Sequence, residues 1–338
     1  MIDGSTVLLL AEVVVVALVV VAFVAARKYS TTKPDPAKVF TKFQCKPTQG
    51  PTLSIVVPCY NEEERLPPML QQTLDFCLDA KKRCVDDATS RAEGLFADFE
   101  IVVVDDCSRD KTADVVTKFA KDHPEAIIKL VRVNPNRGKG FAVRRGFFEA
   151  SGDYVLMADG DNATQISDVT KLFKALRKPL SSSGQPASNM PPVIAIGSRA
   201  HLEEKAIARR TFFRTVLMKV FHFVVSVTYF FGTRGSLCKL RDTQCGFKLF
   251  DRRVTEILFL NNRLERWAFD VEILLTARRR GLKVAEVPVR WEEIPGSKVR
   301  LRGMVQMGLE CLLMCFTYSL GVWSIVKPPS KPKSSSSS

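Results

Sequence analysis

Residues 152–164 read Gly-Asp-Tyr-Val-Leu-Met-Ala-Asp-Gly-Asp-Asn-Ala-Thr, an apolar run followed by two acids. The apolar run, residues 154–158, is short and bounded by Gly and Asp, which is the pattern of a buried strand. Two carboxylates, Asp159 and Asp161, follow the strand around one glycine. Oxygen ligands on a tight turn suit a hard divalent ion, so the pair predicts a Mg²⁺ or Mn²⁺ site. The alternative is an ordinary polar turn, because Asp-Gly is a common loop dipeptide.

Further apolar runs on either side of this stretch predict a parallel sheet. Strands are expected at residues 53–57, 100–104, 126–133 and 193–196, with helices between them, as at residues 112–121. Polar groups follow the first two strands as Asn61-Glu62 and Asp105-Asp106. Because the carboxyl ends of parallel strands meet at one edge, we expect these groups to converge with the Asp159 motif.

The net charge of the chain limits the classes of molecule that it is expected to bind. Lys and Arg number 50 against 36 Asp and Glu, which leaves a net charge of +14. Such a charge favours nucleic acid, an anionic membrane surface or a phosphorylated substrate. The charge lies along apolar segments without basic clusters interleaved with aromatic residues, so we do not expect nucleic acid. The nine cysteines contain no Cys-x-x-Cys pair, which indicates reduced thiols in a cytosolic compartment.

The N-terminal segment predicts a membrane anchor. Residues 7–26 are apolar except for Glu12, and about 20 such residues span a bilayer. Positive residues follow this run, so the positive-inside rule places the rest of the chain in the cytosol. We therefore expect a transmembrane anchor over residues 1–28 and a linker over residues 29–52. The glycosylation sequon at Asn162 agrees, because a cytosolic domain is not glycosylated there.

Two more apolar segments are expected at the membrane. Residues 211–232 carry Arg214, Lys219 and His222 on one side of a helix, which favours an interfacial helix at about residues 209–232 over a buried core helix.

The second segment, residues 304–326, contains Gln306 and Glu310 and has positive charge at both ends. Spanning and interfacial modes stay open, and we favour a C-terminal membrane-associated helix over residues 301–326. Residues 179–192 predict a flexible loop, and residues 327–338 predict a disordered tail.

Two common phosphate-binding motifs are absent. The chain has no GxxxxGK[ST] loop, and Gly138-x-Gly140 has Val143 where a dinucleotide-binding loop has its third glycine. We therefore do not expect an ordinary P-loop NTPase or dehydrogenase.

A set of seven segments resembles the family-2 inverting glycosyltransferases of GT-A fold. The likeness covers roughly residues 52–325. The matching segments are 57–63 (Val-Pro-Cys-Tyr-Asn-Glu-Glu), 104–112 (Val-Asp-Asp-Cys-Ser-Arg-Asp-Lys-Thr), 136–140 (Asn-Arg-Gly-Lys-Gly), 158–161 (Ala-Asp-Gly-Asp), 197–202 (Gly-Ser-Arg-Ala-His-Leu), 241–250 (Arg-Asp-Thr-Gln-Cys-Gly-Phe-Lys-Leu-Phe) and 266–272 (Arg-Trp-Ala-Phe-Asp-Val-Glu).

The resemblance implies the fold and the reaction. It implies an α/β fold with a mainly parallel, Rossmann-like GT-A sheet over residues 53–300, flanked by helices, beside the anchor and the interfacial helices. It also implies transfer of glucose from UDP-glucose to dolichyl phosphate, assisted by Mg²⁺ or Mn²⁺, at the cytosolic face of the endoplasmic reticulum membrane for protein N-glycosylation. The alternatives are mannose transfer from GDP-mannose and a catalytically idle membrane-surface protein. A homo-oligomer is left open.

Roles on the donor side come from the same resemblance. One of Asp105 and Asp106 would accept from the uracil imide, and Asp159 and Asp161 would hold the sugar nucleotide through the metal. The residues assigned to the nucleotide-sugar pocket are Pro58, Tyr60, Asn61, Glu62, Asp105, Asp106, Lys139 and Asp159.

For the acceptor phosphate, binding by cationic side chains matters more than proton removal by a general base. A polyprenyl phosphate is already an anionic nucleophile near neutral pH, so groups that bind and orient it matter most. If a general base exists, Asp242 and Asp270 compete for the role, and we favour Asp242. The candidates for binding the acceptor phosphate are Arg199, Arg209, Arg210, Lys248, Ser297 and Lys298.

One further match is set aside. Residues 263–267 end in Arg-Trp like the Gln-x-x-Arg-Trp motif of processive polysaccharide synthases, but the Gln is missing and the segment precedes Asp270. We interpret it as a chance likeness.

Overall fold

The computed structural model describes residues 52–86, 96–183, 193–202, 223–233, 235, 240–294 and 301–325. The expected transmembrane anchor and disordered tail lie outside these residues, as does nearly all of the expected linker. Within the described ranges, no helix combines the length and the apolar character that crossing a bilayer requires.

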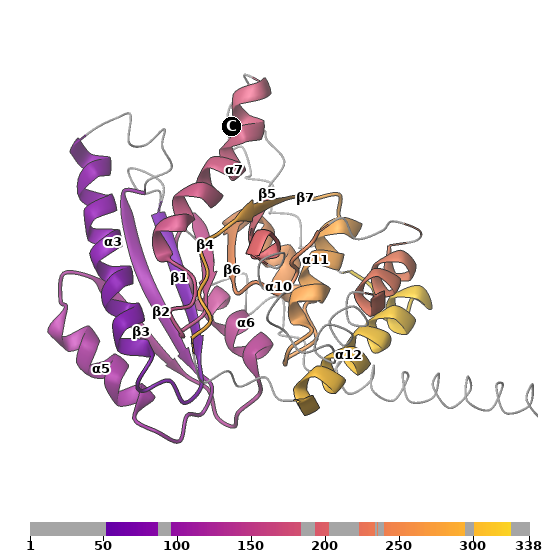
Figure 1. The fold of residues 1–338 in the computed structure, drawn as a ribbon, viewed down its shortest axis with the longest axis horizontal. Coiled ribbons are helices and arrows are strands. Elements are labelled where there is room, and N and C mark those ends of the chain that lie inside the picture. Colours follow the sequence, from indigo (N-terminus) through magenta and orange to yellow (C-terminus); the bar gives the residue numbers. More distant parts are fainter. Residues whose placement is uncertain are drawn as a thin grey trace, which may run out of the picture.

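A seven-stranded sheet forms the centre of the molecule, in the order β3-β2-β1-β4-β6-β5-β7 (Figure 1). β6 runs antiparallel to its neighbours β4 and β5, and the other pairs are parallel. The expectation of a mainly parallel sheet is therefore confirmed. The strands are β1 (Thr52–Cys59), β2 (Asp98–Asp105), β3 (Ile127–Arg132), β4 (Tyr154–Ala158), β5 (Val193–Ser198), β6 (Phe247–Asp251) and β7 (Lys283–Pro288).

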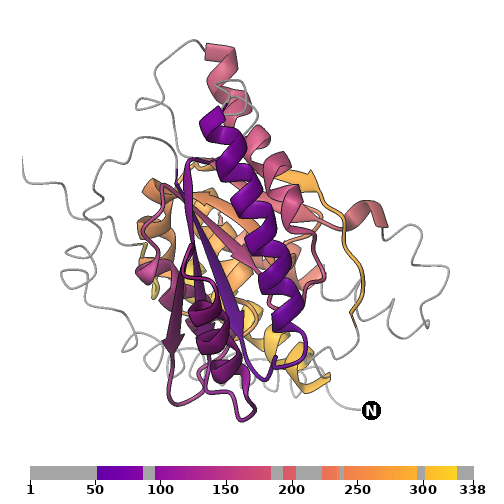
Figure 2. The same cartoon turned by 90° about the vertical axis from the view of Figure 1, so that its left-hand side faces the viewer.

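Helices cover both faces of this sheet, which explains why its central strands β1 and β4 are mostly apolar. The helices are α3 (Leu66–Asp86), α5 (Thr112–Asp122), α6 (Lys139–Glu149), the 3-10 turn η1 (Ile166–Asp168), α7 (Val169–Ser183), α10 (Arg252–Asn261), α11 (Phe269–Arg279) and α12 (Leu301–Ser319). On β1, Ile55 and Val57 face the core under α3 and α7, whereas Val56 faces the core under α6 and α11. Figure 2 shows α3 lying across its face of the sheet.

Three local expectations were wrong. The charged sequence of residues 79–98 is typical of a surface insertion, but α3 continues to Asp86 because Ala80 and Cys84 continue its buried face, and residues 87–95 lie outside the described residues. Asn61 precedes a Glu-rich segment, a place that predicts a helix N-cap, but α3 begins only at Leu66, and the Asn61 Oδ1 accepts from the Arg109 N–H at 2.8 Å. The first part of the loop expected at residues 179–192 is helical, since α7 extends to Ser183, and residues 184–192 lie outside the described residues.

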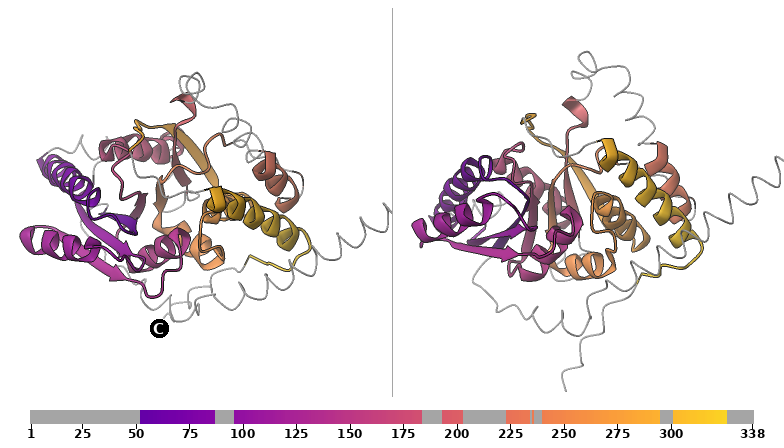
Figure 3. Two further views of the ribbon diagram at one scale, coloured as in Figure 1. Left: turned by 60° about the horizontal axis from the view of Figure 1, so that its bottom comes forward. Right: turned by 90° about the horizontal axis from the view of Figure 1, so that it is seen from below.

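Two helices stand on the outer side of α11. The described part of the expected interfacial helix, residues 223–232, lies beside α12 (Figure 3), and the Thr228 hydroxyl donates to the Cys311 carbonyl at 3.1 Å. Arg214, Lys219 and His222 lie outside the described residues. The pair exposes large apolar side chains, which we call the apolar surface: Phe223, Phe230, Phe231, Leu309, Leu312, Leu320 and Val322.

The packing of α6 on the sheet gives a stability prediction. A Cβ added at Gly146 would overlap with Val56 Cγ1 and approach Val104 Cγ2 to 2.9 Å. Gly146→Ala should therefore destabilise the protein by about 1–3 kcal/mol, because overpacking forces the neighbours to move. Denaturant unfolding of the purified protein measures the change.

Gly308→Ala is the matched control within a helix. Nothing lies within 4 Å of its added Cβ, so alanine should stabilise α12 by about 0.5–1 kcal/mol. A Gly146→Ala protein as stable as the wild type would contradict the close packing of α6.

Candidate functional site

The polar strand ends meet at one edge of the sheet. β2, β1 and β4 are neighbours, so the segments that follow them lie side by side. A cavity of about 660 Å³ opens between these segments. The predicted site residues that line it are Pro58, Tyr60, Glu62, Asp106, Lys139, Asp159, Asp161 and Arg199.

The loops after β1 and β2 are joined by paired hydrogen bonds. The Glu63 N–H donates to Asp110 Oδ2 at 3.2 Å, and the Lys111 N–H donates to Glu63 Oε2 at 2.9 Å. The Glu62 N–H donates to the Thr112 hydroxyl at 2.8 Å. Asn61, which is absent from the cavity lining, takes part in the same contact through Arg109. Asn61 therefore supports the shape of the pocket from outside it.

The two acids after β2 have different surroundings. Asp105 is buried, and its Oδ1 accepts from the Ser108 N–H at 3.0 Å. Asp106 lines the cavity and accepts from the N–H groups of Arg137 at 2.9 Å and Gly138 at 2.6 Å. Burial raises the pKa of Asp106 even though these N–H groups oppose the shift. Of the pair, Asp106 is the acid that a nucleotide in the cavity could reach, and its contact with a uracil imide stays a prediction.

Asp159 carries an ion pair with another residue of the cavity lining. The Lys139 Nζ, at the start of α6, lies 2.6 Å from Asp159 Oδ1. Burial lowers the pKa of Lys139, but the carboxylates of Asp159 and Asp270 outweigh that effect and raise it. A cation already sits against this carboxylate, which shows that the position favours positive charge.

The carboxylates after β4 could supply some of the ligands of a hard divalent ion. Asp159 and Asp161 offer carboxylate oxygens from one turn, which is the chemistry that Mg²⁺ and Mn²⁺ prefer. In the described part of the chain, no group of three His, Cys, Asp or Glu side chains is placed around one point. An ion held by this pair would therefore need further oxygens from a substrate or from water.

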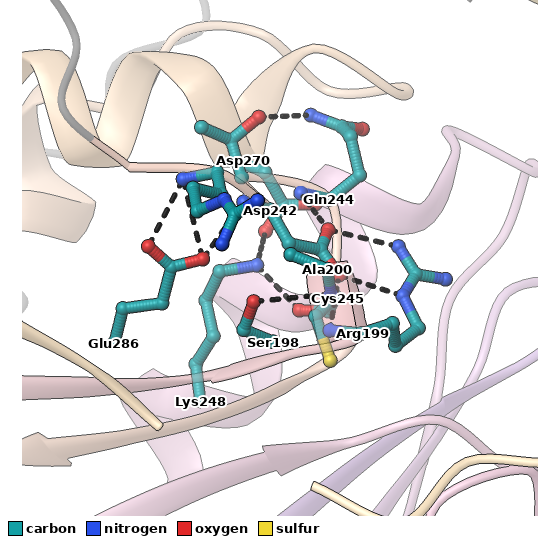
Figure 4. Close-up of polar contacts among 11 residues, drawn as sticks. Ser198, Arg199, Ala200, Asp242, Gln244, Cys245, Lys248, Asp270 and Glu286 are labelled. Atoms are coloured by element: carbon teal, nitrogen blue, oxygen red, sulfur yellow. Dashed lines mark hydrogen bonds and ion pairs between the residues drawn. The ribbon is translucent and has the colours of Figure 1, made fainter. Parts of the chain in front are cut away.

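Arg199 is fixed by a bidentate ion pair (Figure 4). Its Nε lies 2.7 Å from Asp242 Oδ2, its Nη2 lies 2.9 Å from Asp242 Oδ1, and its guanidinium lies 5.4 Å from the centre of the Trp291 ring. The Asp242 N–H donates to Glu286 Oε1 at 3.0 Å. Burial opposes ionisation of Asp242, but Arg199 outweighs it and holds the pKa of this carboxyl below its ordinary value.

This geometry makes Asp242 a support for Arg199. Both carboxylate oxygens of Asp242 are engaged, and a lowered pKa makes it a weak base. Arg199 reaches the cavity, whereas Asp242 is absent from the lining. The expected base role of Asp242 therefore stays a prediction, and its place in the structure does not favour it.

Lys248 and Asp270 form a buried pair beside the cavity (Figure 4). The Lys248 Nζ lies 2.6 Å from Asp270 Oδ1 and donates to the Cys245 carbonyl at 2.6 Å. Both side chains are almost fully buried, and burial raises the pKa of Asp270 although Lys248 and Lys139 oppose the shift. Neither residue lines the cavity. The structure thus does not bring Lys248 to an acceptor phosphate or Asp270 to a proton-transfer position.

Several cavity residues were missed from the sequence. Arg266 and Trp267 line the cavity, although their segment was set aside as a chance likeness to another motif. Trp291 also lines it, because the segment after β7 pairs with Thr164 across an isolated bridge. The Arg-Trp pair was visible in a matching segment, whereas no sequence signal placed residue 291 beside residue 164. The other predicted phosphate ligands, Arg209, Arg210, Ser297 and Lys298, lie outside the described residues.

The chain belongs to glycosyl transferase family 2, since the model of that family matches residues 54–256. The family expected from the motifs is therefore confirmed, and with it the expectation of an enzyme. Its relatives include the dolichyl-phosphate beta-glucosyltransferase of Homo sapiens, 42% identical over 274 residues that cover 81% of this chain and 78% of the relative. The protein of the same name from Drosophila melanogaster is 43% identical over 282 residues, covering 83% and 79%.

A solved structure was also found. Glucosyl-3-phosphoglycerate synthase from Mycobacterium tuberculosis, in complex with Mn²⁺, UDP and glucosyl-3-phosphoglycerate, is 16% identical to this chain. The match covers 85% of this chain and 84% of that one, with a TM-score of 0.47. At this level of likeness we carry nothing over to the present site.

The backbone around Asp159 gives a prediction. A Cβ at Gly246 would overlap with Asp159 Oδ2, whereas a Cβ at Gly160 would meet its neighbours at ordinary distances of 3.4 to 3.6 Å. Gly246→Ala should displace the carboxylate and lower sugar transfer on the order of 100-fold, because small misplacements in a site are costly. The rate of transfer from a radiolabelled sugar nucleotide measures the effect.

Gly160→Ala is the control from the same motif and should keep most of the activity. Equal losses in Gly160→Ala and Gly246→Ala, or no loss in either, would show that the close approach at Gly246 does not fix Asp159.

Proposed function

We propose that the protein transfers glucose from UDP-glucose to dolichyl phosphate, giving dolichyl β-D-glucosyl phosphate and UDP. The observation that carries this proposal is the cavity in which acids and cations from separate segments meet at the ends of β1, β2 and β4. We infer the sugar and the lipid acceptor from relatives about 40% identical to this chain, which are named dolichyl-phosphate beta-glucosyltransferases. The residues that line the cavity supply the chemistry.

The reaction is one displacement. An oxygen of the lipid phosphate forms a bond to C1 of glucose as the bond from C1 to the diphosphate oxygen of UDP breaks. The electron pair of that bond leaves with UDP, and the configuration at C1 inverts. No proton has to be removed from the phosphate anion, so a buried Asp242 and a buried Asp270 are compatible with the reaction.

On the donor side, the diphosphate needs positive charge as it leaves. Asp159 and Asp161 would hold Mg²⁺ or Mn²⁺, and a bound ion of this kind neutralises charge that develops on the leaving diphosphate. Lys139 supplies a second positive charge next to Asp159. Asp106, at the nucleoside end of our assignment, accepts hydrogen bonds from the loop that leads into α6.

On the acceptor side, the cavity offers fixed guanidinium groups. Burial lowers the pKa of Arg199, but the contacts with Asp242 outweigh this effect and raise it, so the guanidinium is charged near neutral pH. Its bidentate pair with Asp242 fixes the direction of the remaining N–H donors. Arg266 lines the same cavity. We assign these two residues to the lipid phosphate.

The apolar surface fits a membrane. Phe223 and Phe231 on one helix and Leu309 and Leu320 on and after α12 are more than half exposed. A dolichyl phosphate keeps its chain in the bilayer, so the enzyme has to reach it at the headgroup level. We assign the apolar surface to the cytosolic face of the endoplasmic reticulum membrane.

One assay tests the donor, the acceptor and the metal. Purified full-length protein would be given dolichyl phosphate, Mg²⁺ and either radiolabelled UDP-glucose or GDP-mannose. Label from UDP-glucose should enter the lipid phase, and Asp161→Asn should reduce it on the order of 100-fold, because a metal stabilises transition-state charge by several kcal/mol.

Asp75→Asn, on the exposed side of α3, is the control and should keep wild-type activity. If only GDP-mannose labelled the lipid, the assignment of glucose as the transferred sugar would be wrong. If Asp161→Asn left the transfer rate unchanged, Asp161 would not bind a metal that the reaction needs.

A further inference from the structure

A segment that lines the cavity is held from behind by α12. The N–H of Ala268, next to Trp267, donates to Glu310 Oε2 at 3.1 Å. The other oxygen, Glu310 Oε1, accepts from Gln306 Nε2 at 3.0 Å, and Glu310 is only 5% exposed. A buried carboxylate of α12 thus fixes the backbone beside a side chain that faces the substrate.

The front of the same segment supports the donor site. The Gly140 N–H donates to the Arg266 carbonyl at 3.0 Å, and the Phe141 N–H donates to the Glu265 carbonyl at 2.9 Å. These two amides belong to the first turn of α6, which also carries Lys139. Residues 265–268 therefore lie between α12 and the helix that presents the Lys139 amine to Asp159.

A second contact from α12 holds the chain just before this segment. The Arg263 Nη1 donates to the Tyr318 hydroxyl at 3.1 Å, and that hydroxyl donates to Glu272 Oε1 at 3.0 Å. The Glu272 Oε2 accepts from the N–H groups of Arg263 and Leu264 at 2.7 and 2.8 Å. All three side chains are buried. The inner face of α12 thus braces the turn from α10 to α11 at two places.

The outer face of α12 belongs to the apolar surface. Leu309, next to Glu310 in the chain, is 63% exposed, and Leu312 is 40% exposed. The outer face of α12 therefore exposes apolar side chains, and its inner face contacts the segment that lines the cavity.

We propose that Glu310 is a positioning residue for sugar transfer. From the helix that we assign to the membrane surface, its carboxylate fixes residues 265–268 and so sets the places of Arg266 and Trp267 in the cavity. Through the first turn of α6, the same contact sets the place of Lys139. The kinetic part of this inference rests on the proposed function, whereas the structural part does not.

Three variants at Glu310 test the proposal. Glu310→Leu removes the acceptor, Glu310→Asp withdraws it by one methylene group, and Glu310→Gln keeps an acceptor oxygen at the same reach. We expect kcat/KM for UDP-glucose to fall roughly tenfold or more in the Leu and Asp variants and to stay within about threefold in the Gln variant. The Asp variant keeps the test open if Glu310→Leu does not fold.

Hydrogen exchange supplies a readout that needs no turnover. Amides of residues 265–268 should exchange faster in the Leu and Asp variants and near the wild-type rate in the Gln variant. A protein that transferred no glucose would overturn the proposed function, and these exchange rates would still decide the positioning role.

Thr317→Val is the matched control on α12. Its hydroxyl is buried and, among the described residues, donates to the Leu313 and Met314 carbonyls of its own helix. This variant should lower the melting temperature without changing kcat/KM or the exchange of residues 265–268. If Glu310→Leu and Glu310→Asp changed only the melting temperature, as Thr317→Val should, the proposal would be overturned.

Discussion

The contact on which the site depends is the one that Asp159 makes at the end of β4. Its carboxylate lies against the backbone of Gly246 on one side and against the Lys139 amine, 2.6 Å away, on the other. Gly246 leads into β6, and Lys139 begins α6. One acid therefore joins the end of a central strand, the antiparallel strand beside it and the helix packed over it, so displacement of any of these changes the donor site.

Acids near the cavity are paired with basic side chains. Arg199 pairs with Asp242, Lys248 with Asp270 and Lys139 with Asp159, so each of these three acids has a cation beside it, and the Lys248–Asp270 pair is buried. Buried pairs of this kind contribute little net stability, because desolvation offsets their attraction. Their value lies in fixed geometry. Two of the cations, Arg199 and Lys139, face the cavity where anionic phosphates of both substrates would have to be held close together.

The sequence predicts the central strands and most of the acids of the site, but it does not predict contacts between distant residues. β1, β2 and β4 are short apolar runs that end in acids or amides, and parallel pairing brings such ends together. β6 was missed because its Lys248 interrupts the apolar pattern, and only the structure shows that Asp270 neutralises it. Trp291 enters the cavity through pairing with Thr164, a contact between distant segments that no local pattern encodes. Asp242 was favoured as a base from the resemblance of its segment, and the sequence cannot show that Arg199 engages both its oxygens.

We propose that this cavity binds a nucleotide through a cation held by the acids after β4. Calorimetric titration of UDP into the purified full-length protein, with Mg²⁺ or Mn²⁺ and again with EDTA, measures that binding and its dependence on the metal. We predict one UDP per chain, with affinity that falls at least about tenfold in EDTA and in Asp159→Asn, because an ion bridging two anions strengthens binding electrostatically. UDP binding that is the same with and without the metal, and unchanged by Asp159→Asn, would contradict the account.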